Sequence, residues 1–127
     1  MSKPTYEDAR VMLGLIQAGS AFGVNEALGI IWADDFPKSA AEFWEKYPMG
    51  SPGFNAVLGA MRYFETIGTL VRNGLFNENL AYDWLAIKPV WERVKPIAED
   101  MRGDTPALWE NFEYMAERQR NWTPTRD

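Results

Sequence analysis

FNAVLGAMRYFETIGTLVRNGLFNENLAYDWL, residues 54–85, is the stretch that decides the fold. When residues 54–73 are placed on a helix, apolar side chains cover nearly the whole circumference and leave only a narrow polar strip. A helix of this kind is normally buried among other helices. Gly74 can end it, because glycine adopts the left-handed conformation at low cost, and Asn77 can cap a return helix. We therefore predict an all-α fold, a single-domain bundle of six to seven helices around a central helix near residues 52–73.

The length and composition support one globular domain over residues 1–127. The chain has 127 residues, of which 46% are hydrophobic and 24% charged, which are ordinary values for a folded domain. Six Trp, seven Phe and five Tyr predict a core rich in aromatic rings. No segment shows strand alternation, a repeat or a linker, and we expect a loose C-terminal tail from about residue 121.

The charge balance and two missing residue types exclude several functions. Thirteen basic and eighteen acidic residues give a net charge of −5, which argues against nucleic-acid binding and against an electrostatic membrane anchor. The chain has no Cys, which excludes disulfides and thiolate chemistry. It has no His, the commonest general base and metal ligand. We expect no metal, no cofactor and no nucleic-acid partner.

The N-terminal region carries no sign of export or of membrane insertion. Its first ten residues are polar and acidic where a secretory signal would begin its apolar segment. The uncharged run of this region, Val11–Asn25, is shorter than the about 20 apolar residues that a membrane span requires. We therefore expect a cytoplasmic protein without a membrane span.

Helix starts are predicted from capping residues along the chain. Thr5 begins a first helix, whose inward face we expect to consist of Tyr6, Ala9, Met12, Leu13 and Ile16. Gly19-Ser20 is expected to interrupt this helix, with Ser20 capping the second. Ser51-Pro52 starts the central helix, and Thr105-Pro106 starts the last one, because Pro is favoured just after a cap.

A small set of polar and aromatic residues forms the candidate site. Glu65 and Arg72 lie at the edge of the apolar face of the central helix, and Tyr82-Asp83 follows across the Gly74 turn. These residues could form a ligand-binding pocket, or an ion-pair network that fixes how two helices dock. We favour the structural interpretation. Trp44, which lies near a loop, is a further candidate ligand-binding residue.

Small residues recur at helical spacing in the first two helices. Gly14, Ala18, Ala21 and Asn25 form one strip, and Gly19 and Gly23 overlap it. In a soluble protein such a strip indicates close backbone packing within the fold or a symmetric dimer interface.

Spaced motifs in the second half of the chain resemble a known family. They are Phe64-Glu65-x-x-Gly68-x-Leu70-Val71-Arg72-x-Gly74-Leu75, Tyr82-Asp83, Trp91-x-x-x-x-Pro96 and Trp109-x-x-Phe112-Glu113-x-x-Ala116-Glu117. Over about residues 36–120 the chain resembles an uncharacterised bacterial family of small α-helical proteins, a domain of unknown function. The resemblance implies a helical fold and transfers no catalytic residue.

Three hypotheses for function follow from the sequence. The first is a non-enzymatic interaction or regulatory module that binds itself as a homodimer, or another protein, through an apolar helix face. The second is a small-molecule binding protein for a cationic or aromatic ligand, with Trp and Tyr rings and Glu65 or Asp83 as the counter-charge. The third is a carboxylate-based hydrolase, which needs two carboxylates in one open pocket.

Overall fold

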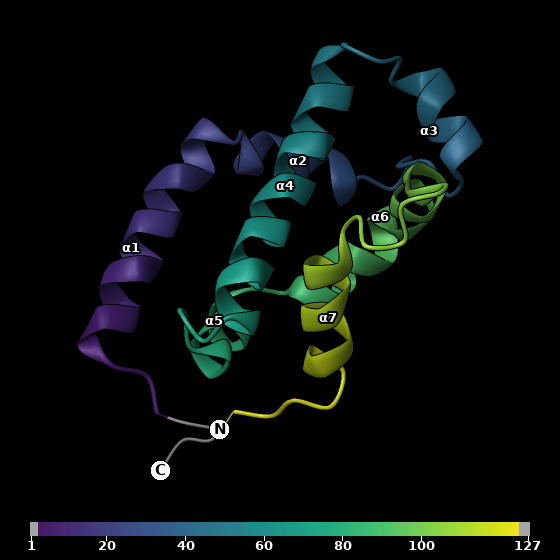
Figure 1. Cartoon of the computed structure of the whole chain (residues 1–127). Helices are drawn as coiled ribbons and strands as arrows, with labels where there is room; N and C mark the ends of the chain where they lie inside the picture. Colours follow the sequence, from purple (N-terminus) through teal and green to yellow (C-terminus); the bar gives the residue numbers. More distant parts are fainter. Residues whose placement is uncertain (1–2, 125–127) are drawn as a thin grey trace.

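Seven helices make up the fold in the computed structural model, which describes residues 3–124 (Figure 1). They are α1 (Tyr6–Ala21), α2 (Val24–Ile31), α3 (Ala40–Lys46), α4 (Pro52–Arg72), α5 (Glu78–Trp84), α6 (Ile87–Arg102) and α7 (Glu110–Gln119). The described residues contain no strand. The predicted all-α fold with six to seven helices is confirmed.

The long helix α4 runs through the middle of the molecule, as the sequence predicted. Ser51 caps it, since its Oγ accepts a hydrogen bond from the Phe54 N–H at 3.3 Å, and Pro52 occupies the first turn. Gly74, with φ of 72°, turns the chain at its end. Ten of its 21 residues are buried, and it packs most extensively against α2 and α7.

Two glycines of α4 mark places where the backbone of another segment comes close to the backbone of α4. A Cβ atom on Gly59 would lie 2.6 Å from the carbonyl oxygen of Phe22, at the corner between α1 and α2. A Cβ atom on Gly68 would lie 2.4 Å from the carbonyl oxygen of Asn111, in the first turn of α7. Both contacts are with backbone, which cannot move aside as a flexible side chain can. These glycines therefore set how closely α4 approaches its neighbours.

Helix α1 differs from the prediction in its length and in its buried face. It continues through Gly19-Ser20, and the break falls at Gly23, whose φ of 69° starts α2. The predicted cap by Ser20 is therefore wrong. Gly19 is buried in the helix against the ring of Tyr63, whose hydroxyl donates to the Leu15 carbonyl.

The inward face predicted for α1 points largely to solvent. Tyr6, Leu13 and Ile16 are 91%, 63% and 47% exposed. The buried residues of α1 are Leu15 and Gly19. The two faces were not distinguishable by pattern, because Leu15 and its neighbours are as apolar as the residues that face outward.

Helix α7 begins later than predicted. Residues 106–109 form turns, and Trp109, with φ of 66°, is the residue before the helix. The Arg102 Nε–H donates to the Leu108 carbonyl at 2.8 Å, which holds these turns on the end of α6. The predicted start at Thr105-Pro106 is therefore wrong, because the side chain of Arg102, at the end of α6, holds the residues that follow in turns.

The aromatic core predicted from composition lies between α4, α6 and α7. Phe64 stacks on Phe112 with ring centroids 5.0 Å apart, and Trp91 meets Phe112 edge-on at 4.9 Å.

The first part of the expected C-terminal tail packs on α5, because the Trp122 Nε1–H donates to Asn79 Oδ1 at 2.8 Å. The rest of that tail lies outside the described residues.

Candidate functional site

Glu65 caps the N-terminus of α7 from the neighbouring helix α4. Its carboxylate accepts hydrogen bonds from the backbone N–H groups of Asn111 and Phe112, at 3.0 and 2.9 Å, and from Asn111 Nδ2 at 2.8 Å. The first N–H groups of a helix have no partner within the helix, and the residue before α7, Trp109, supplies no side-chain cap. Glu65 supplies the missing acceptors, and its negative charge lies at the positive end of the α7 dipole.

Arg72 reaches the same part of α7 two turns further along α4. Its Nη1 donates to Asn111 Oδ1 at 3.3 Å, and its guanidinium carbon lies 4.6 Å from the centre of the Tyr114 ring. Glu65 and Arg72 therefore share Asn111 as a partner. The structure brings these two predicted residues together at a helix contact.

Tyr82 and Asp83 lie away from the contact of Glu65 and Arg72 with α7, and each has its own neighbours. The Tyr82 hydroxyl donates to Glu78 at 2.9 Å, and Glu78 also accepts two hydrogen bonds from Arg118, at 2.7 and 2.6 Å. Asp83 is exposed and lines a shallow hollow of about 440 Å³ together with Trp84. The predicted cluster of Glu65, Arg72 and Asp83 is thus divided between two places in the fold.

The pKa values at the Glu78 cluster follow from these contacts. The hydrogen bonds from Arg118 lower the pKa of Glu78 against the opposing effect of burial, and the bond from Tyr82 lowers it further. Burial, together with the bond to Glu78, raises the pKa of Tyr82. Glu78 is therefore a charged structural partner at neutral pH.

Acid should weaken the fold through Glu78. Because its pKa is lower in the folded chain than in the unfolded one, its contribution is complete at neutral pH and is lost as the pH falls below about 4.3. We expect Glu78→Gln to lower the free energy of unfolding by about 1–3 kcal/mol at pH 7 and to flatten its dependence on pH between 7 and 3. Urea titrations at several pH values measure both effects.

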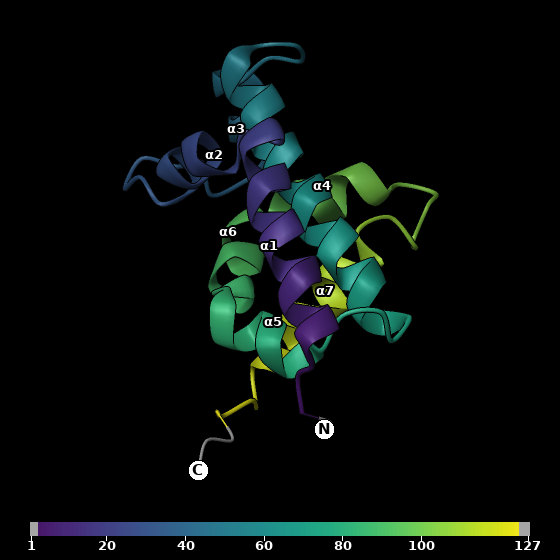
Figure 2. The same ribbon diagram turned by 90° about the vertical axis from the view of Figure 1, so that its left-hand side faces the viewer.

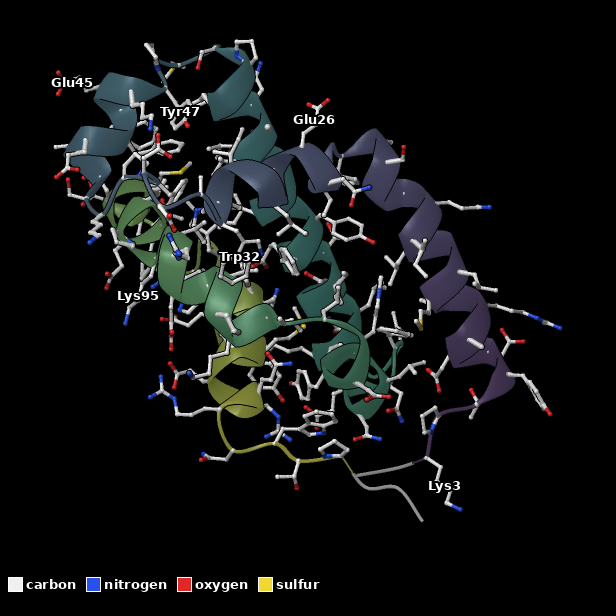
Figure 3. All side chains as sticks on the ribbon, turned by 180° about the vertical axis from the view of Figure 1, so that it is seen from behind. Lys3, Glu26, Trp32, Glu45, Tyr47 and Lys95 are labelled. Carbon is white, nitrogen blue, oxygen red and sulfur yellow. The ribbon has the colours of Figure 1, made fainter. Side chains whose placement is uncertain are left out.

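The matched control for this prediction is Glu45→Gln. Glu45 projects from α3 into solvent (Figure 3). If the two variants show the same stability at pH 7 and the same pH dependence, the assignment to Glu78 is wrong.

Trp44 uses its polar atom within the fold. Its Nε1–H donates to Asp100 at 2.9 Å and so joins α3 to α6. Its ring packs on Phe43 and Phe54, with centroids 5.3 and 5.8 Å away. Tyr47 completes this aromatic group between α3 and the start of α4 (Figure 3). Trp44 is therefore part of the packing of α3.

A cleft of about 570 Å³ opens between the start of α1 and the turn after α4. Asp8 and Glu78 line it. Asp8 accepts hydrogen bonds from the backbone N–H of Thr5 at 2.8 Å and of Asn77 at 3.0 Å. Although partial burial acts to raise the pKa of Asp8, the hydrogen bonds from Thr5 and Asn77 lower it. A general acid needs a raised pKa, so Asp8 and Glu78, whose pKa values are lowered, are poorly suited to that role.

No pattern in the sequence pointed to two important amide side chains. One organises the contact between α4 and α7, and the other organises the start of α6. Asn111 joins α7 to Glu65 and Arg72. Gln119 Nε2 donates to the carbonyl of Leu85, and Gln119 Oε1 accepts from the Lys88 N–H at 2.8 Å, which satisfies the backbone between α5 and α6. The boundary at Lys88-Pro89 was visible in the sequence, but its partner 31 positions away was not.

The outer face of α1 is an apolar surface that no other element of residues 3–124 covers (Figure 2). We define it as the seven exposed residues Tyr6, Ala9, Arg10, Leu13, Ile16, Gln17 and Ser20. Figure 2 shows α1 in front of the other helices, with no other described element over it. From Val11 to Ala21 the helix carries no charge, which is unusual for a surface helix, since the outward face normally holds charged and polar residues.

Residues 3–124 contain neither a cluster of metal-ligating side chains nor a single helix that could span a membrane. This part of the chain brings together no group of three acidic residues that could hold a metal ion. None of its helices is by itself long and apolar enough to cross a membrane, although α1 and α2 meet the length and composition requirement together, across a bend of 72°.

The fold and the site define a small all-α domain in which Glu65 and Trp44 use their polar atoms in contacts between helices. The family model of a domain of unknown function, DUF4760, matches residues 6–119, and the chain belongs to this family. No curated protein and no solved structure matched the chain.

Proposed function

We propose that the protein is a non-enzymatic interaction module and that the outer face of α1 is its contact surface. The observation that carries the proposal is the exposure of Tyr6, Leu13 and Ile16 on one side of a surface helix that carries no charge from Val11 to Ala21. Apolar side chains gathered on one face mark interaction sites in soluble proteins. The candidate residues for chemistry support the same proposal, since Glu65 and Trp44 are engaged in packing.

Helix α1 is suited to this role because the residues of its outer face do not hold the helix on the rest of the fold. It is fixed by the buried residues Leu15 and Gly19 on the inner side, and by the bond between Asp8 and the Asn77 N–H at its start. Substitutions on the outer face should therefore change binding without changing the fold.

Photocrosslinking at position 13 tests the proposal. The chain carries a benzoylphenylalanine in place of Leu13 or, as a control, in place of Ala41, which is exposed on α3. We expect an adduct of defined mass from position 13 in the cells that express the protein, and none from position 41. If position 13 gives no adduct, or if positions 13 and 41 give adducts in equal yield, the proposal is overturned.

The hollow at Asp83 favours ligand binding as a second candidate function. It measures about 440 Å³ and is lined by Tyr82, Asp83 and Trp84, a combination suited to a small cation with an apolar part. A thermal-shift screen of aromatic amines tests it, with Asp83→Asn as the matched variant. If no amine raises the melting temperature of the original chain, or if the variant responds equally, this candidate fails.

A further inference from the structure

We infer that the partner of α1 is a second copy of this chain, bound with the two α1 helices antiparallel across a two-fold axis near Leu13. The inference rests on the proposed function and names the partner of that same surface. In such a pairing, residue i of one helix lies opposite residue 26 − i of the other. A two-fold interface requires a surface that complements itself, and the outer face of α1 does so in side-chain size and in charge.

The sizes of the side chains complement each other in this arrangement. Tyr6, the largest residue of the face, lies opposite Ser20, one of the smallest, and Ala9 lies opposite Gln17. Leu13 meets Leu13 of the second copy at the axis, where its exposed 63% becomes covered. A parallel pairing would instead place Tyr6 against Tyr6 and Ser20 against Ser20, and would leave a gap at one end.

The charges select the same orientation. Arg10 is the one cation of the outer face, and it pairs with Glu7 at 2.9 Å. The antiparallel arrangement lays Arg10 over Ile16 of the other copy, where its aliphatic stem can pack while the guanidinium stays in water. A parallel arrangement would bring the two Arg10 side chains together. The antiparallel helix dipoles also attract each other.

The size of the surface predicts a weak dimer. Helix α1 has sixteen residues and is therefore about 24 Å long. One such helix pair buries less than the about 1,200–2,000 Å² of a stable complex. We expect a dissociation constant of about 10–500 µM.

Directional crosslinking tests the geometry in the full chain, which contains no cysteine of its own. Single cysteines replace Leu13, Tyr6 or Ser20, and a short bismaleimide is added. Leu13→Cys should crosslink to itself. Tyr6→Cys and Ser20→Cys should each crosslink poorly alone and efficiently when mixed. Ala41→Cys is the control, and it measures how much crosslinking results from random collision of two chains.

Charge substitutions at position 16 give a second readout. In the antiparallel dimer, Ile16→Glu places a carboxylate opposite Arg10 of the other copy, whereas Ile16→Lys places two cations together. We expect the Glu variant to associate at least about fivefold more tightly than the Lys variant, since two symmetric pairs each contribute up to about 1 kcal/mol. Equal affinities, which a parallel pairing predicts, would overturn the orientation.

The outcomes separate this inference from the proposed function. Crosslinking of Tyr6→Cys to itself contradicts the antiparallel geometry. If no cysteine variant crosslinks above the Ala41→Cys level and position 13 photocrosslinks to a different protein, the second copy is the wrong partner and the interaction surface stands. If neither experiment gives a product from α1, both the inference and the proposed function fail.

Discussion

Replacing Gly68 by alanine is expected to destabilise the protein by about 3 kcal/mol or more, with a fall in melting temperature of about 10 °C. The new Cβ would lie 2.4 Å from the Asn111 carbonyl oxygen and 2.6 Å from its carbon. Since both atoms are backbone, α7 has to move away from α4. That movement also separates Glu65 from the N–H groups that it caps.

Gly14→Ala is the matched control for this prediction. Gly14 lies in the middle of α1, and a Cβ atom added there would meet nothing within 4 Å. Alanine at this position should stabilise the chain slightly, by about 0.5–1 kcal/mol, because glycine is unfavourable inside a helix. Thermal melts in which Gly68→Ala is as stable as Gly14→Ala would show that α4 and α7 are not in close contact.

Removal of the Glu65 carboxylate is the second large effect that we expect. Glu65→Ala should lower the free energy of unfolding by about 2–4 kcal/mol, because three hydrogen bonds to a charged acceptor are lost and the first turn of α7 is left without a cap. Glu65→Gln should cost less, since one amide oxygen can still accept. Urea unfolding measures both variants.

Glu110→Ala serves as the comparison. Glu110 is exposed in the same first turn of α7, so it interacts with the helix dipole without capping a backbone N–H, and its removal should cost at most about 1 kcal/mol. Equal costs for Glu65→Ala and Glu110→Ala would mean that Glu65 does not act as a cap.

The local parts of the fold could be predicted because they depend on neighbouring residues. The Ser51-Pro52 start and the Gly74 turn of α4 follow from short-range capping chemistry, and the structure shows both. The start of α7 could not be predicted in this way. Its pattern at Thr105-Pro106 is a valid cap, but the acceptor that caps α7 is the Glu65 carboxylate on α4, 46 positions before Asn111.

The face of α1 was ambiguous for a different physical reason. Periodicity identifies a buried face only when the opposite face is polar. In α1, Leu13 and Ile16 on one side are as apolar as Leu15 on the other, so the pattern could not say which side meets the core. That ambiguity is itself the signal of a surface helix with an uncovered apolar side.

The candidate site was only partly accessible from sequence. Glu65 and Arg72 stand out in the sequence because an apolar helix does not need charge at those positions, and the structure shows them together at α7. Their common partner, Asn111, lies 46 residues after Glu65, and no local pattern distinguishes it from other asparagines. Asp83 was placed with them by its nearness in sequence, whereas α5 carries it to another surface.

Self-association through α1 is tested most directly by sedimentation equilibrium of the full chain, with Leu13→Glu as the comparison, from about 5 to 500 µM. We expect the average mass of the original chain to rise from monomer toward dimer over this range. The Leu13→Glu variant should remain a monomer with an unchanged melting temperature, because Leu13 is exposed. A strict monomer at the highest concentration, or equal association of the two chains, would contradict dimerisation through α1.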